Sequence, residues 1–440
     1  MSELFDALVS TPEMDEAFSD ASVLDAMLRF ETALASAEAQ AGVIPESAAR
    51  SIASVDLTVF DARAIAGSAR AAATPVIAFV ESLTKAVAAK DRDAANFVHR
   101  GATSQDVTDT ALVLCLRRAR TSVHATHTRT VAALRRLSTE HASTVMLART
   151  LLQPAPPTTL GLKAAGWLGS VQRAHLALAD AFDRALVLQF GGASGTLAAL
   201  GPDGIAVAGF LARELDLPLP DAPWHAHRDR LASLVACCGV YAGAIAKAAR
   251  DVALLMQGEV AEASEPGGGS STMAHKRNPA GCAVALASAS RVPGLVATYL
   301  ANMSQEHERG VGGLQAEWAT ITAAVSSTGA ASAALAGVFE TLRIDPARMR
   351  RALDETHGAI FAERAMMRLA PVLGRDMAAR AVADAVASAA RGESFARALL
   401  ANADARAALT DDERASLESP DAYLGAAEQF RRRLTGEGSD

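Results

Sequence analysis

A glycine-rich stretch in the second half of the chain carries the densest set of reactive side chains. It reads SEPGGGSSTMAHKRNPAG over residues 264–281, with Ser270 and Ser271 after three glycines and with Lys276 and Asn278 before a proline. Hydroxyl, ammonium and backbone N–H groups, together with a helix that begins after the proline, can stabilise an oxyanion on serine or on a substrate. This set suits the removal of a proton beside a carboxylate, because the doubly negative intermediate needs strong stabilisation.

The three glycines at 267–269 are costly to order, because glycine loses more backbone freedom on folding than any other residue. We expect them to act as a hinge that lets the loop close over a substrate and exclude water. A nucleotide-binding loop is excluded, because GxxxxGK[ST] requires a glycine before Lys276 and the chain has no GxGxxG fingerprint.

Two histidine-rich segments are further candidates. PWHAHRDR (223–230) has two interpretations: His225, Arg228 and Arg230 bind a carboxylate, or they form ion pairs between helices. A metal site would need a third ligand, so no metal is predicted. QEHERG (305–310) offers Arg309 as a residue that lines the site. His124 and His127, three residues apart on a predicted helix, are expected at the surface.

The composition limits the class of protein. The 440 residues carry a net charge of -7, which argues against a general nucleic-acid binder, and only 4% are aromatic, which with abundant alanine favours helices. Four cysteines without CxxC spacing and an N-terminus without a signal-peptide pattern indicate a cytoplasmic protein. The 22 uncharged residues from Trp318 to Phe339 could span a bilayer, but small residues dominate them. We expect a buried helix there and no membrane partner.

Five long apolar-periodic stretches predict an all-α fold with a central helical bundle. Polar connectors rich in glycine, proline or histidine separate them. We predict an N-terminal helical domain (1–105), a central five-helix bundle (106–341) and a C-terminal helical domain (342–440). Narrow helix faces rich in alanine and leucine predict a homo-oligomer. The five stretches are 106–141, 157–187, 230–261, 279–302 and 316–341.

The segment GGSSTMAHKRNP resembles the GSSxMPxKxN stretch of the fumarase/aspartase superfamily. HRGATSQDVTDT (99–110) and ARTLLQPAPPTTLGLK (148–163) resemble its other two conserved regions, in the same order and spacing. Further segments, including LVLQFGGASGTLAALG and PWHAHRDRL, point to one branch, the bacterial 3-carboxy-cis,cis-muconate cycloisomerases. The resemblance implies an all-α three-domain subunit, a homotetramer whose active sites are each built from three subunits, and neither cofactor nor metal.

The resemblance also implies roles for individual residues. Ser270 would handle the proton next to a carboxylate, while Lys276 and Asn278 would stabilise the aci-carboxylate. A second group would hold the carboxylates of a small polycarboxylate substrate. Its members are Thr103, Ser104, Gln105, Ser271, Met273, His225, Arg228, Arg230 and Arg309.

Three positions depart from the superfamily pattern. Leu151 stands where adenylosuccinate and argininosuccinate lyases have a general-acid histidine, and Ala283 stands where they have its glutamate partner. Neither side chain transfers a proton, which fits a cycloisomerase, because a carboxylate leaves without being protonated. Ala274 replaces a proline and should loosen the loop slightly.

The resemblance therefore implies an enzyme that interconverts 3-carboxy-cis,cis-muconate and 4-carboxymuconolactone in aromatic catabolism. Three alternatives stay open: a cycloisomerase for a related muconate such as the 3-sulfo analogue, a succinate-type lyase, and a non-enzymatic helical scaffold. The Ser-Lys-Asn set speaks against the scaffold.

Overall fold

A computed structural model describes residues 3–269, 272–273 and 275–438. The chain divides into two compact units. The first comprises Met1–His127, Arg173–Ala246 and Val284–Ala334, and the second comprises Thr128–Gln172, Lys247–Ala283 and Leu335–Asp440.

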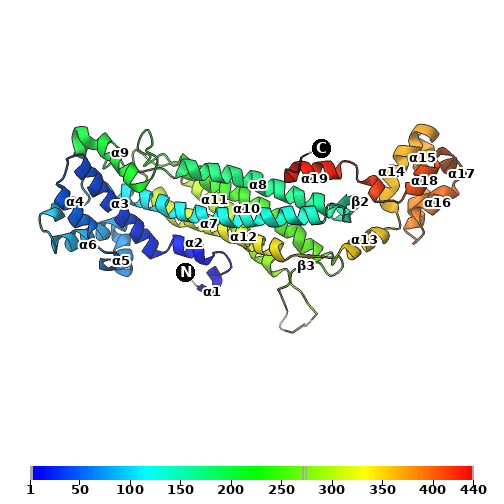
Figure 1. Cartoon of the computed structure of the whole chain (residues 1–440), viewed down its shortest axis with the longest axis horizontal. Coiled ribbons are helices and arrows are strands. Elements are labelled where there is room, and N and C mark those ends of the chain that lie inside the picture. Colours follow the sequence, from blue (N-terminus) through cyan, green and yellow to red (C-terminus); the bar gives the residue numbers. More distant parts are fainter. Residues whose placement is uncertain (1–2, 270–271, 274, 439–440) are drawn as a thin grey trace. The chain divides into compact units, whose positions relative to one another are not determined.

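Five long helices run through the middle of the sequence, as predicted. Each lies within a few residues of its predicted range, because the apolar periodicity of long helices is a strong signal. They are α7 (Ser104–Glu140), α8 (Leu160–Ala185), α10 (Asp229–Leu255), α11 (Ala280–Ala301) and α12 (Gly313–Thr341) (Figure 1). The all-α prediction is confirmed.

The first unit adds seven shorter helices. α3 packs against α4 and α9, and its buried face includes Phe30 and Leu34. Ser19 begins α3 by accepting a hydrogen bond from the backbone N–H of Ser22. The helices are α1 (Glu3–Asp6), α2 (Pro12–Ala17), α3 (Asp20–Gln40), α4 (Glu46–Ala53), α5 (Ala62–Ala72), α6 (Val76–Ala88) and α9 (Gly204–Leu215).

The second unit holds two short sheets and the C-terminal helices. α14 to α17 lie together (Figure 1). They share one apolar core that includes Leu369, Phe395 and Leu399. Its elements are β1 (Val145–Thr150), β2 (Gln153–Thr159), β3 (Ala263–Ser264), β4 (Arg343–Ile344), α13 (Pro346–Asp354), α14 (Ala362–Leu373), α15 (Arg375–Ala389), α16 (Phe395–Ala401), α17 (Ala403–Ala408), α18 (Asp411–Ser416) and α19 (Ala427–Thr435).

The β1–β2 hairpin lies where the sequence indicated only a polar connector. β2 reads QPAPPTT, and its prolines hide a strand because they lack the N–H that a ladder needs. A two-stranded sheet tolerates them, since each strand has a free edge. The register shifts between Leu147 and Ala148, opposite the prolines.

The three most apolar long helices differ in how much of them is covered. Each is long and apolar enough to cross a membrane by length and composition alone. The helix α12 contains all of 318–339, and its apolar window is 67% buried, while that of α10 is 50% buried. The window of α11 is only 28% buried, so this chain leaves most of an apolar helix uncovered.

The prediction that His127 lies at the surface is wrong. Its side chain is buried, and its ring stacks on that of His175 with centroids 3.6 Å apart and planes 3° from parallel. Its Nδ1 lies 3.1 Å from the hydroxyl of Tyr241. Burial lowers the pKa of His127 to about 3 and that of His175 to about 4, and the neighbouring His124 adds to both shifts.

This stacked pair should make the protein sensitive to acid. The unfolded chain protonates both histidines below pH 6.5, whereas the fold keeps them neutral down to pH 3–4, so stability falls as the pH drops through this window. We expect a loss of about 2 kcal/mol between pH 7.5 and pH 5, since about 1.4 kcal/mol per pH unit applies to each buried histidine and solvent reduces the sum. Urea unfolding at both pH values measures it.

The control for this test is an exposed histidine. His175→Asn should flatten the dependence of stability on pH between 7.5 and 5. His357→Asn should leave it unchanged, because His357 is exposed and is not part of the stack. Equal pH dependence in wild type and His175→Asn would contradict the assignment to the stack.

Candidate active site

The segment before α7 is fixed by Asp106, a fully buried carboxylate. Asp106 accepts hydrogen bonds from the backbone N–H groups of Thr103, Gly191 and Gly192, each at 2.9 Å, and its Oδ1 lies 2.7 Å from Nε2 of His225. These bonds tie 103–106 to the loop that follows α8. The sequence suggested only that Asp106 suits the helix dipole, and its position in the core shows a larger structural role.

Three of the predicted carboxylate-binding residues meet in the first unit. The guanidinium of Arg309 donates to Oγ1 of Thr103 at 3.0 Å and to Oε1 of Gln105 at 3.1 Å. It also donates to the carbonyl oxygens of Gly192 and Ala193. Ser104, the first residue of α7, is half-buried beside them. Residues from three separate parts of the sequence therefore meet at the guanidinium of Arg309, which donates to acceptors on the other two parts.

Arg228 differs from the prediction that it binds substrate. Its side chain is fully buried, and all three guanidinium nitrogens donate to protein acceptors. It bridges Asp109 on α7, at 2.8 and 2.9 Å, and Glu317 on α12, at 2.8 Å, and its guanidinium carbon lies 4.8 Å from the centre of the Trp224 ring. Of the two interpretations, ion pairs between helices match the structure, because no N–H direction is left for a ligand.

His225 and Arg230 flank Arg228 in the sequence. The carbonyl oxygen of His225 accepts a hydrogen bond from Nε2 of Gln105 at 2.8 Å. The side chain of His225 is buried, and its ring contacts the carboxylate of Asp106. Arg230 is the second residue of α10 and is half-buried. Among the described residues, no three His, Cys, Asp or Glu side chains are placed to hold a metal ion.

Sequence reasoning missed the partners of Arg228. Glu317 also accepts hydrogen bonds from the hydroxyl of Tyr299 at 2.9 Å and from Nε2 of Gln305 at 2.6 Å. Burial raises the pKa of Glu317, although Arg228 opposes this shift. One signal was available: Glu317 immediately precedes the 22 uncharged residues, and a lone carboxylate at the edge of a buried helix needs a partner.

The signature loop belongs to the second unit. Ser270, Ser271 and Ala274 lie outside the described residues. Met273 is described and is 42% exposed. Lys276 and Asn278 line a pocket of about 590 Å³. Five other polar or charged residues share it: Ser264, His275, Arg277, Arg343 and the acidic Asp345.

The neck of this loop is closed by backbone contacts. The N–H of Asn278 donates to the carbonyl oxygen of Gly268 at 2.8 Å, and Gly269 forms an isolated bridge with Arg277. Gly268 has φ +74°, and a Cβ there would lie 2.0 Å from the carbonyl oxygen of Asn278. A Cβ on Gly267, by contrast, would meet nothing within 4 Å. Close backbone approach therefore explains Gly268, and the hinge role of the glycines stays a prediction.

The sequence suggested that N–H groups at the start of α11 are free to bind an anion, but in the structure a side chain already binds two of them. The carboxylate of Glu265 accepts from the N–H of Gly281 at 2.7 Å and from that of Cys282 at 3.1 Å. This negative charge already occupies the positive end of the helix.

Two of the three positions that depart from the superfamily pattern, Leu151 and Ala283, are exposed. Leu151 is 97% exposed at the tip of the β1–β2 hairpin, and Leu151 and Leu152 both have positive φ, which is strained for leucine. Ala283 is exposed near the start of α11. Neither position carries a group that transfers a proton.

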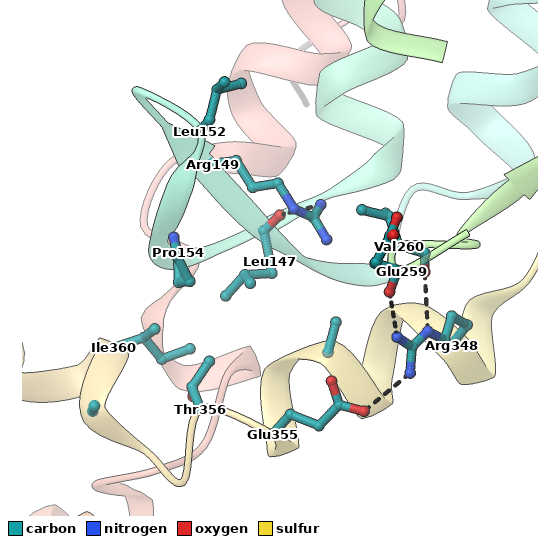
Figure 2. Close-up of a pocket in the computed structure, with 12 residues that line it drawn as sticks. Leu147, Arg149, Leu152, Pro154, Glu259, Val260, Arg348, Glu355, Thr356 and Ile360 are labelled. Carbon is teal, nitrogen blue, oxygen red and sulfur yellow. Dashed lines mark hydrogen bonds and ion pairs between the residues drawn. The ribbon is translucent and has the colours of Figure 1, made fainter. Parts of the chain in front are cut away.

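A pocket of about 540 Å³ lies between this hairpin and α13, and its arginines are already paired (Figure 2). Figure 2 shows Arg348 donating to the carbonyl oxygens of Glu259 and Val260 and, on its other side, to Glu355. Arg149 donates to both oxygens of buried Glu262, at 2.6 and 3.0 Å. This pocket therefore has few unpaired positive groups that could bind an anion. The pocket with Lys276 and Asn278 is the better candidate for an anion-binding site in the second unit.

A helical fold with a polar cluster around Arg309 and a glycine-rich loop that carries lysine and asparagine is typical of a lyase-type enzyme. The lyase family model matches residues 7–294, and the model of the adenylosuccinate lyase C-terminus matches residues 358–434. The chain belongs to this lyase family, the fumarase/aspartase superfamily.

Relatives that match nearly the full length of the chain indicate which branches of the family it resembles. A 3-carboxy-cis,cis-muconate cycloisomerase of Bradyrhizobium diazoefficiens is 44% identical over 99% of this chain and 98% of its own. The crystal structure of the 3-carboxy-cis,cis-muconate lactonizing enzyme of Pseudomonas putida aligns with a TM-score of 0.93, at 42% identity over 99% of both chains. A nitrosuccinate lyase of Streptomyces davaonensis is 40% identical over 96% of this chain and 92% of its own.

Glycine is needed at 268 but not at 267. Gly268→Ala should displace Asn278 and lower turnover at least tenfold, because a misplacement of about 1 Å at a catalytic group can cost a hundredfold. Gly267→Ala should change turnover less than about threefold, since a methyl group there meets open space. Steady-state kinetics of both variants measure this, and equal losses would contradict the close approach and support a hinge.

Proposed function

We propose that this chain is a cycloisomerase that interconverts 3-carboxy-cis,cis-muconate and 4-carboxymuconolactone in the breakdown of protocatechuate. The observation that carries the proposal is the pair Leu151 and Ala283 in a chain with Lys276 and Asn278 in the signature loop. The reaction needs an anion to be stabilised and a carbon to be protonated, but no acid for a leaving group. The names of the nearly full-length relatives support the substrate.

In the lactonising direction, one carboxylate oxygen of the substrate adds across a double bond and closes the ring. The electron pair of that bond moves toward a neighbouring carboxylate and forms an aci-carboxylate, which Lys276 and Asn278 stabilise. The alpha carbon then takes a proton, for which Ser270 is the proposed donor. In the reverse direction, Ser270 removes this proton and the ring carboxylate leaves as an anion. The proposal needs no metal or cofactor in either direction.

The remaining carboxylates of the trianion bind to the donors around α7. Thr103, Ser104 and Gln105 are proposed to hold one carboxylate, with Arg309 beside them. Arginine pairs with a carboxylate through two parallel hydrogen bonds, so it suits a substrate with several negative charges. Ser271, Met273, His225 and Arg230 are proposed to shape the site. Arg228 acts through His225 and Asp109 rather than by contact.

A succinate-type lyase is the second candidate, and the nitrosuccinate lyase relative favours it. Such a lyase would also form an aci-carboxylate, so the same loop would serve it. A cycloisomerase for a sulfonated muconate would use the same donors. Comparison of substrates separates these activities, because only a cycloisomerase closes a ring without releasing a second product.

We also propose a homotetramer with active sites shared between subunits, three domains as predicted (1–105, 106–341 and 342–440), and a cytoplasmic location. The uncovered apolar face of α11 supports assembly with other copies of the chain. The cysteines support a reducing compartment, because all four are free and Cys115, Cys238 and Cys282 are buried.

The substrate assignment is tested with purified protein and 3-carboxymuconate, by the loss of diene absorbance. Lys276→Met should lower kcat/KM roughly 10²–10³-fold, as the loss of one stabilising donor does in other enzymes. Lys85→Met, an exposed lysine on α6, should leave it unchanged. Ser270→Ala should abolish proton transfer.

The outcomes separate the claims. No turnover by the wild type would reject the assignment, and faster cleavage of nitrosuccinate or adenylosuccinate would establish the lyase instead. Normal turnover by Lys276→Met or Ser270→Ala would reject only the role of that residue.

The tetramer is tested by light scattering after size-exclusion chromatography. The wild type should have four times the chain mass of 45.4 kDa. The double change Ala287→Glu and Ala297→Glu places two charges on the uncovered side of α11 and should give smaller species, because a buried unpaired charge is costly. Ala379→Glu, exposed on α15, should remain tetrameric. A monomeric wild type would contradict the proposal.

A further inference from the structure

Glu265 is a buried carboxylate that the proposed mechanism does not use. It is 7% exposed, and its two oxygens accept the N–H groups of Gly281 and Cys282 at 2.7 and 3.1 Å. Glu265 lies at the N-terminal end of the signature loop, and Gly281 and Cys282 lie in the first turn of α11, just after the loop ends. One side chain therefore joins the two ends of the loop.

The N-terminal end of the loop is itself well anchored. The carbonyl oxygen of Glu262 accepts from the N–H of Asp345 at 3.0 Å, and its N–H donates to the carbonyl oxygen of Leu255 at 2.9 Å. The Glu262 carboxylate is fully buried and pairs with Arg149. The next two residues form β3, which is antiparallel to β4. Glu265 thus projects from a rigid base.

The C-terminal end packs closely against Glu265 and Val338 at Gly281. A Cβ on Gly281 would lie 3.0 Å from Oε2 of Glu265 and 2.6 Å from a methyl group of Val338. Lys276 and Asn278 precede this point by only a few residues, and Asn278 is also bonded to Gly268. The place of both side chains therefore depends on where α11 begins.

We infer that Glu265 is a positioning residue that holds Lys276 and Asn278 in place for the reaction. The inference rests on the proposed function of these two residues. An ionised carboxylate forms short, charge-assisted hydrogen bonds with backbone N–H groups, and the positive end of α11 strengthens them. Fixed donors stabilise a developing anion without having to reorganise first, so a loose loop lowers the rate more than the affinity.

Glu265→Gln tests the inference. The amide oxygen can accept one N–H, but the amide NH₂ meets the other N–H and cannot accept it. We expect kcat to fall at least about tenfold and KM to change less than about threefold, because Thr103, Gln105 and Arg309 lie on other segments. Hydrogen exchange should accelerate in 266–269 and 275–283 and stay unchanged elsewhere.

A matched control comes from the first unit. Asp61 caps α5 because its Oδ1 accepts the N–H groups of Arg63 and Ala64 at 2.9 and 3.0 Å, so Asp61→Ala removes a comparable carboxylate cap from a helix start. It should shift the melting temperature as Glu265→Gln does and leave kcat unchanged. Gly281→Ala is a second variant that pushes on the Glu265 carboxylate without removing its charge, and it should lower kcat in the same direction.

Each outcome decides a separate point. Unchanged exchange in Glu265→Gln would overturn the inference, and so would faster exchange with an unchanged kcat. A loss of kcat that Asp61→Ala shares would overturn it too, because it would reflect stability alone. If the wild type does not convert 3-carboxymuconate, the proposed function fails, while the exchange measurement still decides whether Glu265 holds the loop.

Discussion

The buried guanidinium of Arg228 is the interaction on which the first unit depends. It sits between Asp109 and Glu317, so a charge from the start of α10 joins α7 to α12. Removal of one partner from such a bridge leaves an uncompensated buried charge, which costs about 3–5 kcal/mol. Apolar residues could hold these helices together as firmly, but they would not fix rotation and register. The bridge therefore gives orientation more than net stability.

Orientation matters here because the polar core continues into the candidate site. Glu317 binds Gln305 at the start of the segment that carries Arg309, and Asp109 binds Gln105, which Arg309 contacts. The donors proposed for substrate are thus the outer end of a hydrogen-bond network whose inner end is buried. A half-satisfied network would be worse than an apolar core, so each member restricts its neighbours. The signature loop uses a different solution, with glycine for close approach at 268 and a single carboxylate across its ends.

The sequence predicted the elements with strong periodicity and missed those that tertiary contacts define. The start of α12 is an example. Its small apolar residues predicted a buried helix, but the neighbouring sequence does not indicate that Glu317 pairs with Arg228, which lies much earlier in the chain. His127 was misplaced because its polar side chain suggests solvent, whereas its face of α7 meets His175 and Tyr241. The prolines of β2 hid a strand for the reason that they lack ladder donors. The motif-bearing segments were recognised because their residue types are rare in helices, but the contacts that fix them are non-local.

The reaction proposed for this chain depends both on the hydrogen-bond donors that it has and on the acid–base groups that it lacks. The side chains of Thr103, Gln105, Arg309, Lys276 and Asn278 all carry N–H or O–H groups, and such groups can serve any reaction that builds negative charge on a carboxylate. A lyase that expels an amine or an alkoxide must also protonate the group that leaves, because these anions are strong bases. A carboxylate is a weak base and leaves unaided. This chain has many donors for anions, but Leu151 stands at the position of the acid and Ala283 at that of its partner. Such a site therefore favours reactions that form or break a bond to a carboxylate oxygen.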